Sequence, residues 1–171
     1  CPKSTLLPVG MYPVAQIVAI HLAMRMIGTL SRDGIEASSI LPFYHKARHD
    51  GCLRHLVVRK GAATGEILVN LVTSSEINFS VEEFKDMLLA LELEGSFCGI
   101  LHTINDGLAD TVQSDEMHLL YGRDYFMEKL FDLEFKVSVY SFFQTNTAGA
   151  EKLYSIVKEF AGDVENKMVF D

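Results

Sequence analysis

The sequence predicts an α+β protein built on an antiparallel-rich sheet with flanking helices. Segments rich in Val, Leu and Ile come as adjacent pairs, and the first pair is joined by a glycine-bearing loop of moderate length, which is typical of an antiparallel hairpin. A single helix-like segment lies among these pairs, whereas repeated βαβ units would place a helix after every strand. Hydrophobic residues make up 49% of the 171 residues, which is enough for the core of one or two small domains.

The first predicted element is a helix from Pro13 to about Leu30. Proline is well tolerated in the first turn of a helix, where its missing N–H leaves no bond unmade. Apolar positions then recur at helical spacing: Val14, Val18, His21, Leu22 and Met26. The turn-rich segment from Ser31 to Ser39 is predicted to be a connector.

A hairpin and a capped helix follow. The strands are predicted at 53–60 and 66–73, joined by a loop that contains Gly61 and Gly65. Ser80 and Glu83 have the spacing of a capping box, in which each side chain binds a backbone N–H at the start of a helix. The apolar face of this helix is Phe84, Met87, Leu88 and Leu91.

The second half of the chain is predicted to contain four strands and a last helix. The strands are 97–104, 118–121, 124–129 and 134–143, with a polar, irregular stretch at 105–116. The helix ends at Gly162, a residue type that favours helix C-termini. Its apolar face is Ala150, Leu153, Tyr154, Val157 and Phe160.

Charge and cysteine content limit the classes of function. Residues 1–60 carry eight Lys or Arg and three Asp or Glu, whereas residues 61–171 carry seven and twenty. The only gathered positive charge is Lys46, Arg48, Arg54, Arg59 and Lys60, so this chain alone is not expected to bind RNA tightly. Three widely spaced cysteines argue against a disulfide framework and predict a reducing, cytoplasmic compartment. No apolar run is long enough for a membrane span.

One motif is more specific than the rest: Ser141-Phe142-Phe143-Gln144-Thr145-Asn146, followed by a predicted helix and then by Met168-Val169-Phe170-Asp171. This arrangement resembles the segment that leads into the methyl-donor domain of the RNA uracil-5-methyltransferases. In that family a -FxQxN- element precedes a helix and a short strand that ends in Asp. Residues 53–60 and 65–73 are similar to the paired strands of the family's central domain, and residues 119–125 and 133–137 are similar to the hairpin that precedes its -FxQxN- element. The resemblance implies a central domain at 1–138, and at 139–171 a linker, helix and strand start of a Rossmann-like methyltransferase domain that is cut before its glycine-rich loop.

The resemblance also implies roles for individual residues. Gln144 would contact S-adenosylmethionine, and Phe142 would stack on an RNA base, an interaction worth roughly 1–3 kcal/mol. The alternative to these binding roles is a purely structural strand end. In that case the two Phe side chains point alternately inward and outward, and Gln144 caps the following helix. Asn146 is better explained as the helix cap than as part of a pocket. Apart from the resemblance, the positive charges of Arg54, Arg59 and Lys60 suit the neutralisation of RNA phosphates, but a solvated strand face is the more usual explanation.

Metal and nucleophile sites receive less support. His45, His49, His55 and Cys52 lie near one another but lack the ligand spacing of zinc sites. Cys52 and Cys98 are predicted to be small core residues. Cys1-Pro2 is similar to the Cys-Pro dipeptide that carries the last of four iron–sulfur ligands in many family members, which would make Cys1 a remnant of a cluster site in the parent protein.

We therefore expect a fragment of an S-adenosylmethionine-dependent RNA methyltransferase that methylates C5 of a uridine in rRNA or tRNA. The family's nucleophilic cysteine, its Glu base and the donor loop would all follow Asp171, so no catalytic residue is assigned in this chain and the fragment is expected to be inactive alone. The alternative is a non-catalytic acidic protein-interaction module.

Overall fold

The computed structural model describes residues 44–45, 47–77, 80–107 and 116–168. Cys1, the helix expected after Pro13 and the strand expected to end at Asp171 lie outside the described residues. The described elements run in the order β1 (Leu53–Lys60), β2 (Glu66–Thr73), α2 (Val81–Leu89), β3 (Ser96–Ile104), β4 (Glu116–Gly122), β5 (Tyr125–Leu130), β6 (Leu133–Ser138) and α3 (Thr147–Ala161). No helix in these ranges is long and apolar enough to cross a membrane.

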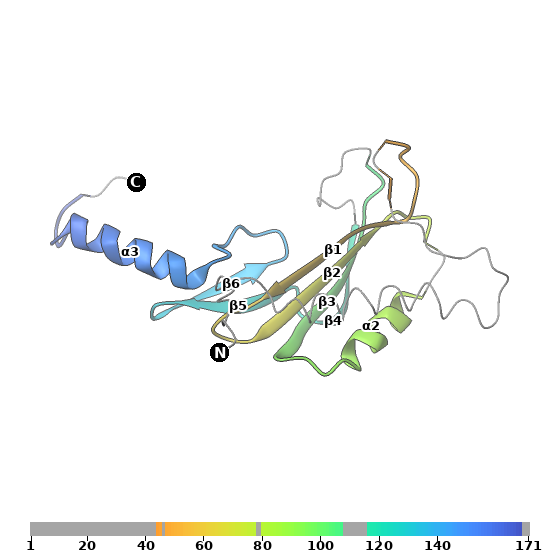
Figure 1. Cartoon of the computed structure of the whole chain (residues 1–171), viewed down its shortest axis with the longest axis horizontal. Helices are drawn as coiled ribbons and strands as arrows, with labels where there is room; N and C mark the ends of the chain where they lie inside the picture. Colours follow the sequence, from red (N-terminus) through yellow and green to blue (C-terminus); the bar gives the residue numbers. More distant parts are fainter. Residues whose placement is uncertain (1–43, 46, 78–79, 108–115, 169–171) are drawn as a thin grey trace, which may run out of the picture.

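The strands form a four-stranded sheet in the order β1-β2-β3-β4 and a separate hairpin of β5 and β6 (Figure 1). The pairs β1–β2, β3–β4 and β5–β6 are antiparallel, which confirms the predicted α+β class with an antiparallel-rich sheet. The pair β2–β3 is parallel, because α2 carries the chain back across the sheet between these two strands. The sheet therefore contains one βαβ unit, which the pairwise arrangement of strands in the sequence did not predict.

The large sheet buries apolar side chains on both faces. Successive residues of a strand point to opposite faces, and the alternation along β2 divides them between two clusters. The first cluster lies between the sheet and α2 and contains Cys52, Leu53, Ile67, Val69, Leu71, Phe84, Leu88 and Ile100. The second cluster lies between the sheet and the β5–β6 hairpin and contains Leu68, Leu101, Phe126, Val137 and Val139. Because both faces are covered, β2 is buried along nearly its whole length.

Helix α2 begins where the capping box predicts. The Oγ of Ser80 accepts a hydrogen bond of 3.2 Å from the backbone N–H of Glu83, and Phe84 and Leu88 are fully buried. This cap satisfies an N–H that has no partner within the helix, so local sequence was sufficient to locate this helix.

Strand β6 ends at Ser138, whereas the sequence predicted a strand through Phe143. The carbonyl groups of Ser138, Val139 and Ser141 all accept hydrogen bonds from Arg59 of β1. Successive carbonyls of an extended strand point in opposite directions, whereas those of Ser138 and Val139 both point to Arg59, so the chain turns here.

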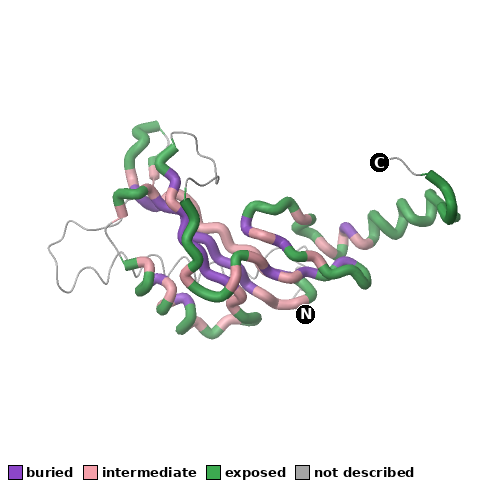
Figure 2. The backbone as a smooth tube through the Cα atoms, turned by 180° about the vertical axis from the view of Figure 1, so that it is seen from behind, coloured by how far each residue is buried: buried purple, intermediate pink, exposed green. Residues whose placement is uncertain are grey.

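Helix α3 leaves the two sheets and projects away from them (Figure 1). Only Ala150, near its start, is buried, and the rest of the helix is intermediate or exposed, as Figure 2 shows. Its predicted apolar face is exposed at Leu153, Tyr154, Val157 and Phe160.

Candidate functional site

The candidate site is the segment from Ser138 to Asn146, which joins β6 to α3; we call it the linker. Arg59 lies beneath its first part. The Nη1 of Arg59 donates to the carbonyl oxygens of Ser138 at 2.7 Å, Val139 at 2.9 Å and Ser141 at 2.7 Å. The guanidinium carbon of Arg59 also lies 5.4 Å from the centre of the Phe126 ring. A single side chain of β1 thus holds three linker carbonyls in place.

A second contact holds Tyr140. Its hydroxyl accepts a hydrogen bond of 3.2 Å from Nδ2 of Asn70 in β2 and lies 3.1 Å from Oγ1 of Thr103 in β3. Thr103 donates to Oδ1 of Asn70 at 3.0 Å, so the Tyr140 hydroxyl is the donor to Thr103. Asn70 and Thr103 are completely buried, and Tyr140 is the group that satisfies their remaining polar atoms.

Phe142 and Phe143 lie in opposite environments. The Phe143 ring is 5.5 Å from the Phe135 ring, centroid to centroid, and packs against the apolar cluster under the hairpin. Phe142 is 85% exposed. Gln144 is also exposed. The structure therefore leaves the two residues expected to bind RNA and the methyl donor accessible.

Asn146 is the N-cap of α3. Its Oδ1 accepts a hydrogen bond of 2.9 Å from the backbone N–H of Gly149. This contact supports the capping role over a role in lining a pocket.

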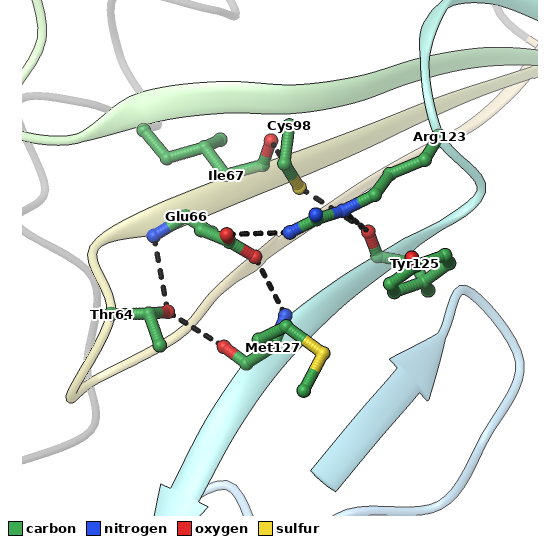
Figure 3. A network of polar contacts seen from close by, with 7 residues as sticks. All are labelled: Thr64, Glu66, Ile67, Cys98, Arg123, Tyr125 and Met127. Atoms are coloured by element: carbon green, nitrogen blue, oxygen red, sulfur yellow. Dashed lines mark hydrogen bonds and ion pairs between the residues drawn. The ribbon is translucent and has the colours of Figure 1, made fainter. Parts of the chain in front are cut away.

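The β5–β6 hairpin that precedes the linker is joined to the large sheet by a polar network (Figure 3). Arg123 donates to Oε1 of Glu66 at 2.5 Å, and the backbone N–H of Met127 donates to Oε2 of Glu66 at 2.6 Å. Partial burial by itself raises the pKa of Glu66, but the hydrogen bonds from Arg123 and Met127, with the positive charge of Arg123, bring that pKa below its usual value.

The β1–β2 loop provides a further junction. Glu128 of β5 accepts hydrogen bonds from the backbone N–H groups of Ala62 at 2.5 Å and Ala63 at 3.0 Å. Thr64 donates from Oγ1 to the carbonyl oxygen of Met127 at 2.6 Å. The carboxylate of Glu128 is almost wholly buried, and these loop amides supply the hydrogen bonds that such a group requires.

Arg54 lies at the other end of β1 and does not contact the linker. Its Nη1 donates to the carbonyl oxygen of Asn105 at 2.7 Å, and its guanidinium carbon lies 4.1 Å from the centre of the Tyr44 ring. Both arginines expected to contact RNA therefore have protein partners, and their contact with phosphate stays a prediction.

The cysteines within the described residues are unsuited to act as nucleophiles. Cys52 is buried, and burial raises the pKa of its thiol. Burial and the nearby charge of Glu66 raise the pKa of Cys98 to about 11. Both groups are therefore protonated thiols near neutral pH. The parts of the chain that the structure describes contain no group of three His, Cys, Asp or Glu side chains arranged to hold a metal.

Sequence reasoning did not find Tyr140, Asn70 or Thr103. Asn70 carried a usable signal, because it interrupts the apolar run Ile-Leu-Val-Asn-Leu-Val of β2. A polar side chain in a strand that is buried on both faces must find a hydrogen-bond partner. Which residue provides that partner depends on the fold.

No family model matches the chain. It is 53% identical over 131 residues to an uncharacterized RNA methyltransferase of Clostridium tetani and 55% identical over 131 residues to one of Clostridium acetobutylicum. Each match covers 77% of this chain and 29% of the relative, so the chain spans less than a third of the length of these relatives.

Among solved structures, the chain is similar to the crystal structure of the Pyrococcus abyssi tRNA (uracil-54, C5)-methyltransferase in complex with S-adenosyl-L-homocysteine. That match has a TM-score of 0.51 and 29% sequence identity, and covers 66% of this chain and 26% of the other. The two clostridial relatives are named RNA methyltransferases, which gives the class of protein that this chain resembles. Together with the structural match, these identities support an RNA uracil-5-methyltransferase family for this chain.

Proposed function

We propose that this chain is part of a longer enzyme that transfers a methyl group from S-adenosylmethionine to C5 of a uridine in tRNA or rRNA. The observation that carries the proposal is the exposure of Phe142 and Gln144 in a linker whose neighbouring residues are fixed. The chemistry named for the Pyrococcus abyssi relative, a uracil C5 methyltransferase crystallised with S-adenosyl-L-homocysteine, supports it.

Phe142 is proposed to stack on an RNA base. Its ring is 85% exposed, so both of its faces can be reached by a base. Stacking on a protein aromatic favours a base that has left its own helical stack, which an enzyme acting on C5 requires. The neighbouring Phe143 already supplies the packing that a purely structural aromatic would provide.

Gln144 is proposed to contact the methyl donor. Its exposed side-chain amide can donate and accept hydrogen bonds at once, as the hydroxyl and amino groups of S-adenosylmethionine require. Bound S-adenosylmethionine supplies an electrophilic methyl group. Within this chain we assign to the donor only the contact with Gln144.

Arg54 and Arg59 are proposed to add positive charge beside the RNA path. Both side chains are partly exposed, so their charge can act on phosphates while their N–H groups bind protein oxygens. C5 of uracil becomes nucleophilic when a thiolate adds at C6. Since Cys52 and Cys98 are protonated thiols, we propose that the nucleophile comes from a part of the enzyme outside this chain, as would an iron–sulfur cluster.

Tritium release tests the position of methylation. The full-length enzyme is incubated with S-adenosylmethionine and unmodified tRNA or rRNA transcripts that carry tritium at C5 of uridine. Methylation at C5 displaces that hydrogen, so we expect donor-dependent release of tritium in step with methyl incorporation. Methyl incorporation without tritium release would place the methyl group elsewhere and contradict the proposal. The RNA that supports the faster release identifies the substrate class.

A further inference from the structure

The linker is held at two independent points that precede Phe142. Arg59 of β1 binds the carbonyls of Ser138, Val139 and Ser141, and the buried pair Asn70–Thr103 of β2 and β3 binds the hydroxyl of Tyr140. Three adjacent strands of the large sheet therefore contact four successive linker residues.

Phe142 itself is bracketed by fixed neighbours. The carbonyl of Ser141 is 2.7 Å from the Arg59 Nη1, and the ring of Phe143 is packed against Phe135. The backbone of Phe142 is thus restrained on both sides while its side chain is 85% exposed. A restrained backbone reduces the number of conformations open to the exposed Phe142 side chain before it meets a ligand.

We propose that Arg59 and Tyr140 are positioning residues that hold the linker so that Phe142 is presented in one orientation to the RNA base. The inference rests on the proposed role of Phe142 as a stacking residue. Its physical basis is preorganisation: a flexible segment loses conformational freedom when it binds, whereas a segment already ordered in the free protein avoids that loss. Neither residue needs to touch the RNA base for this effect.

The first test measures linker order without RNA. The 171-residue chain contains no tryptophan, so Phe142→Trp introduces a single fluorescent reporter at an exposed position. In this background we expect Tyr140→Phe and Arg59→Met each to lower the residual anisotropy of the reporter on the nanosecond timescale. Unchanged anisotropy in both variants would overturn the inference.

Thr64→Val is the matched control for Tyr140→Phe. Each substitution removes one hydroxyl that links the large sheet to the segment after β4, but Thr64 binds Met127 of β5 and does not contact the linker. Thermal melts of both variants report their general loss of stability. A fall in anisotropy for Thr64→Val equal to that for Tyr140→Phe would also overturn the inference, because the effect would then be general loosening.

The second test uses kinetics of the full-length enzyme with unmodified tRNA and rRNA transcripts. Tyr140→Phe leaves the charge unchanged, so any effect is not electrostatic. We expect it to raise the Michaelis constant for RNA about three- to tenfold and to leave that for S-adenosylmethionine unchanged, because the hydroxyl loses its hydrogen bonds to Asn70 and Thr103. Thr64→Val is expected to change neither constant.

The same substitution in a Phe142→Ala background identifies the route of the effect. If Tyr140 acts through Phe142, Tyr140→Phe has no further effect once that ring is absent. Additive effects would overturn the inference. A normal Michaelis constant for Phe142→Ala alone would instead contradict the proposed function of Phe142. The anisotropy measurement would then still decide whether Arg59 and Tyr140 order the linker.

Discussion

Phe142 and Phe143 are adjacent in the chain, yet one ring is 85% exposed and the other packs 5.5 Å from Phe135, centroid to centroid. The two adjacent Phe residues of the -FxQxN- motif therefore differ in what their rings can contact. Phe143 fixes the linker to the hairpin, and Phe142 is left available to a ligand.

Substitution of these two residues should therefore have opposite consequences. We expect Phe142→Ala to leave the melting temperature nearly unchanged and to raise the Michaelis constant for RNA about tenfold or more, because stacking on a base is worth roughly 1–3 kcal/mol. Phe143→Ala should lower the melting temperature, because it removes a ring that is packed in the apolar cluster. Thermal melts and steady-state kinetics measure both. A large loss of stability with unchanged RNA kinetics for Phe142→Ala would refute its substrate role.

Gln144→Ala should mainly weaken binding of the methyl donor. Loss of the side-chain amide leaves a polar group of S-adenosylmethionine without its hydrogen-bond partner. We therefore expect about a tenfold rise in the Michaelis constant for S-adenosylmethionine. The exposed neighbour Thr145 provides the control, and Thr145→Ala should leave that constant unchanged. A change confined to the RNA constant would assign Gln144 to the RNA instead.

Asn146→Ala should destabilise the start of α3 by about 1 kcal/mol, as loss of a helix cap does. Asn146→Ser keeps an oxygen acceptor for the N–H of Gly149 and should retain most of the stability. Circular dichroism melts measure the difference. If Asn146→Ala instead raised the Michaelis constant for the methyl donor at unchanged stability, Asn146 would line the donor site.

Glu66 stabilises the hairpin junction as a carboxylate. Its pKa is lower in the folded chain than its ordinary value of 4.5, so this stabilisation is complete above pH 4.5 and is lost as the pH falls through the folded-state pKa. We expect Glu66→Gln to lower the melting temperature at neutral pH. Below pH 4.5, the melting temperature of Glu66→Gln should fall less with decreasing pH than that of the unaltered chain. Glu94→Gln, at a side chain that is 84% exposed, is the control and should change neither. Parallel pH profiles for Glu66→Gln and the unaltered chain would contradict the assignment.

Cys98 should be unreactive in the folded protein. With a pKa of about 11, against 9.0 for an ordinary thiol, its thiolate fraction at pH 8 is reduced about a hundredfold. Alkylation by iodoacetamide, followed peptide by peptide in the mass spectrometer, should be slower by about that factor in the native chain than in the same chain unfolded in urea. Equal rates would show that Cys98 is accessible as a thiolate.

Local chemistry explains what the sequence predicted correctly. The β1–β2 hairpin follows from two apolar runs around a glycine-bearing loop, and α2 follows from the Ser80 cap and an apolar face at helical spacing. The cap at Asn146 is also a contact between residues three apart. The -FxQxN- motif indicated the family, since it needs only residue types at fixed spacing. Each of these signals is formed by residues that are close together in the sequence.

Only the tertiary structure decided how distant segments meet. The parallel pairing of β2 with β3 depends on the path of α2 across the sheet. The contacts of Arg59 and Tyr140 join residues separated by 37 to 82 positions, and no local pattern specifies such partners. The contacts of Arg59 also accompany the end of β6 at Ser138. The sequence by itself determined which linker residues carry functional groups. The tertiary structure decided which of them are held, through the buried Asn70 and Thr103 and the reach of Arg59 from β1, and which side chain stays exposed.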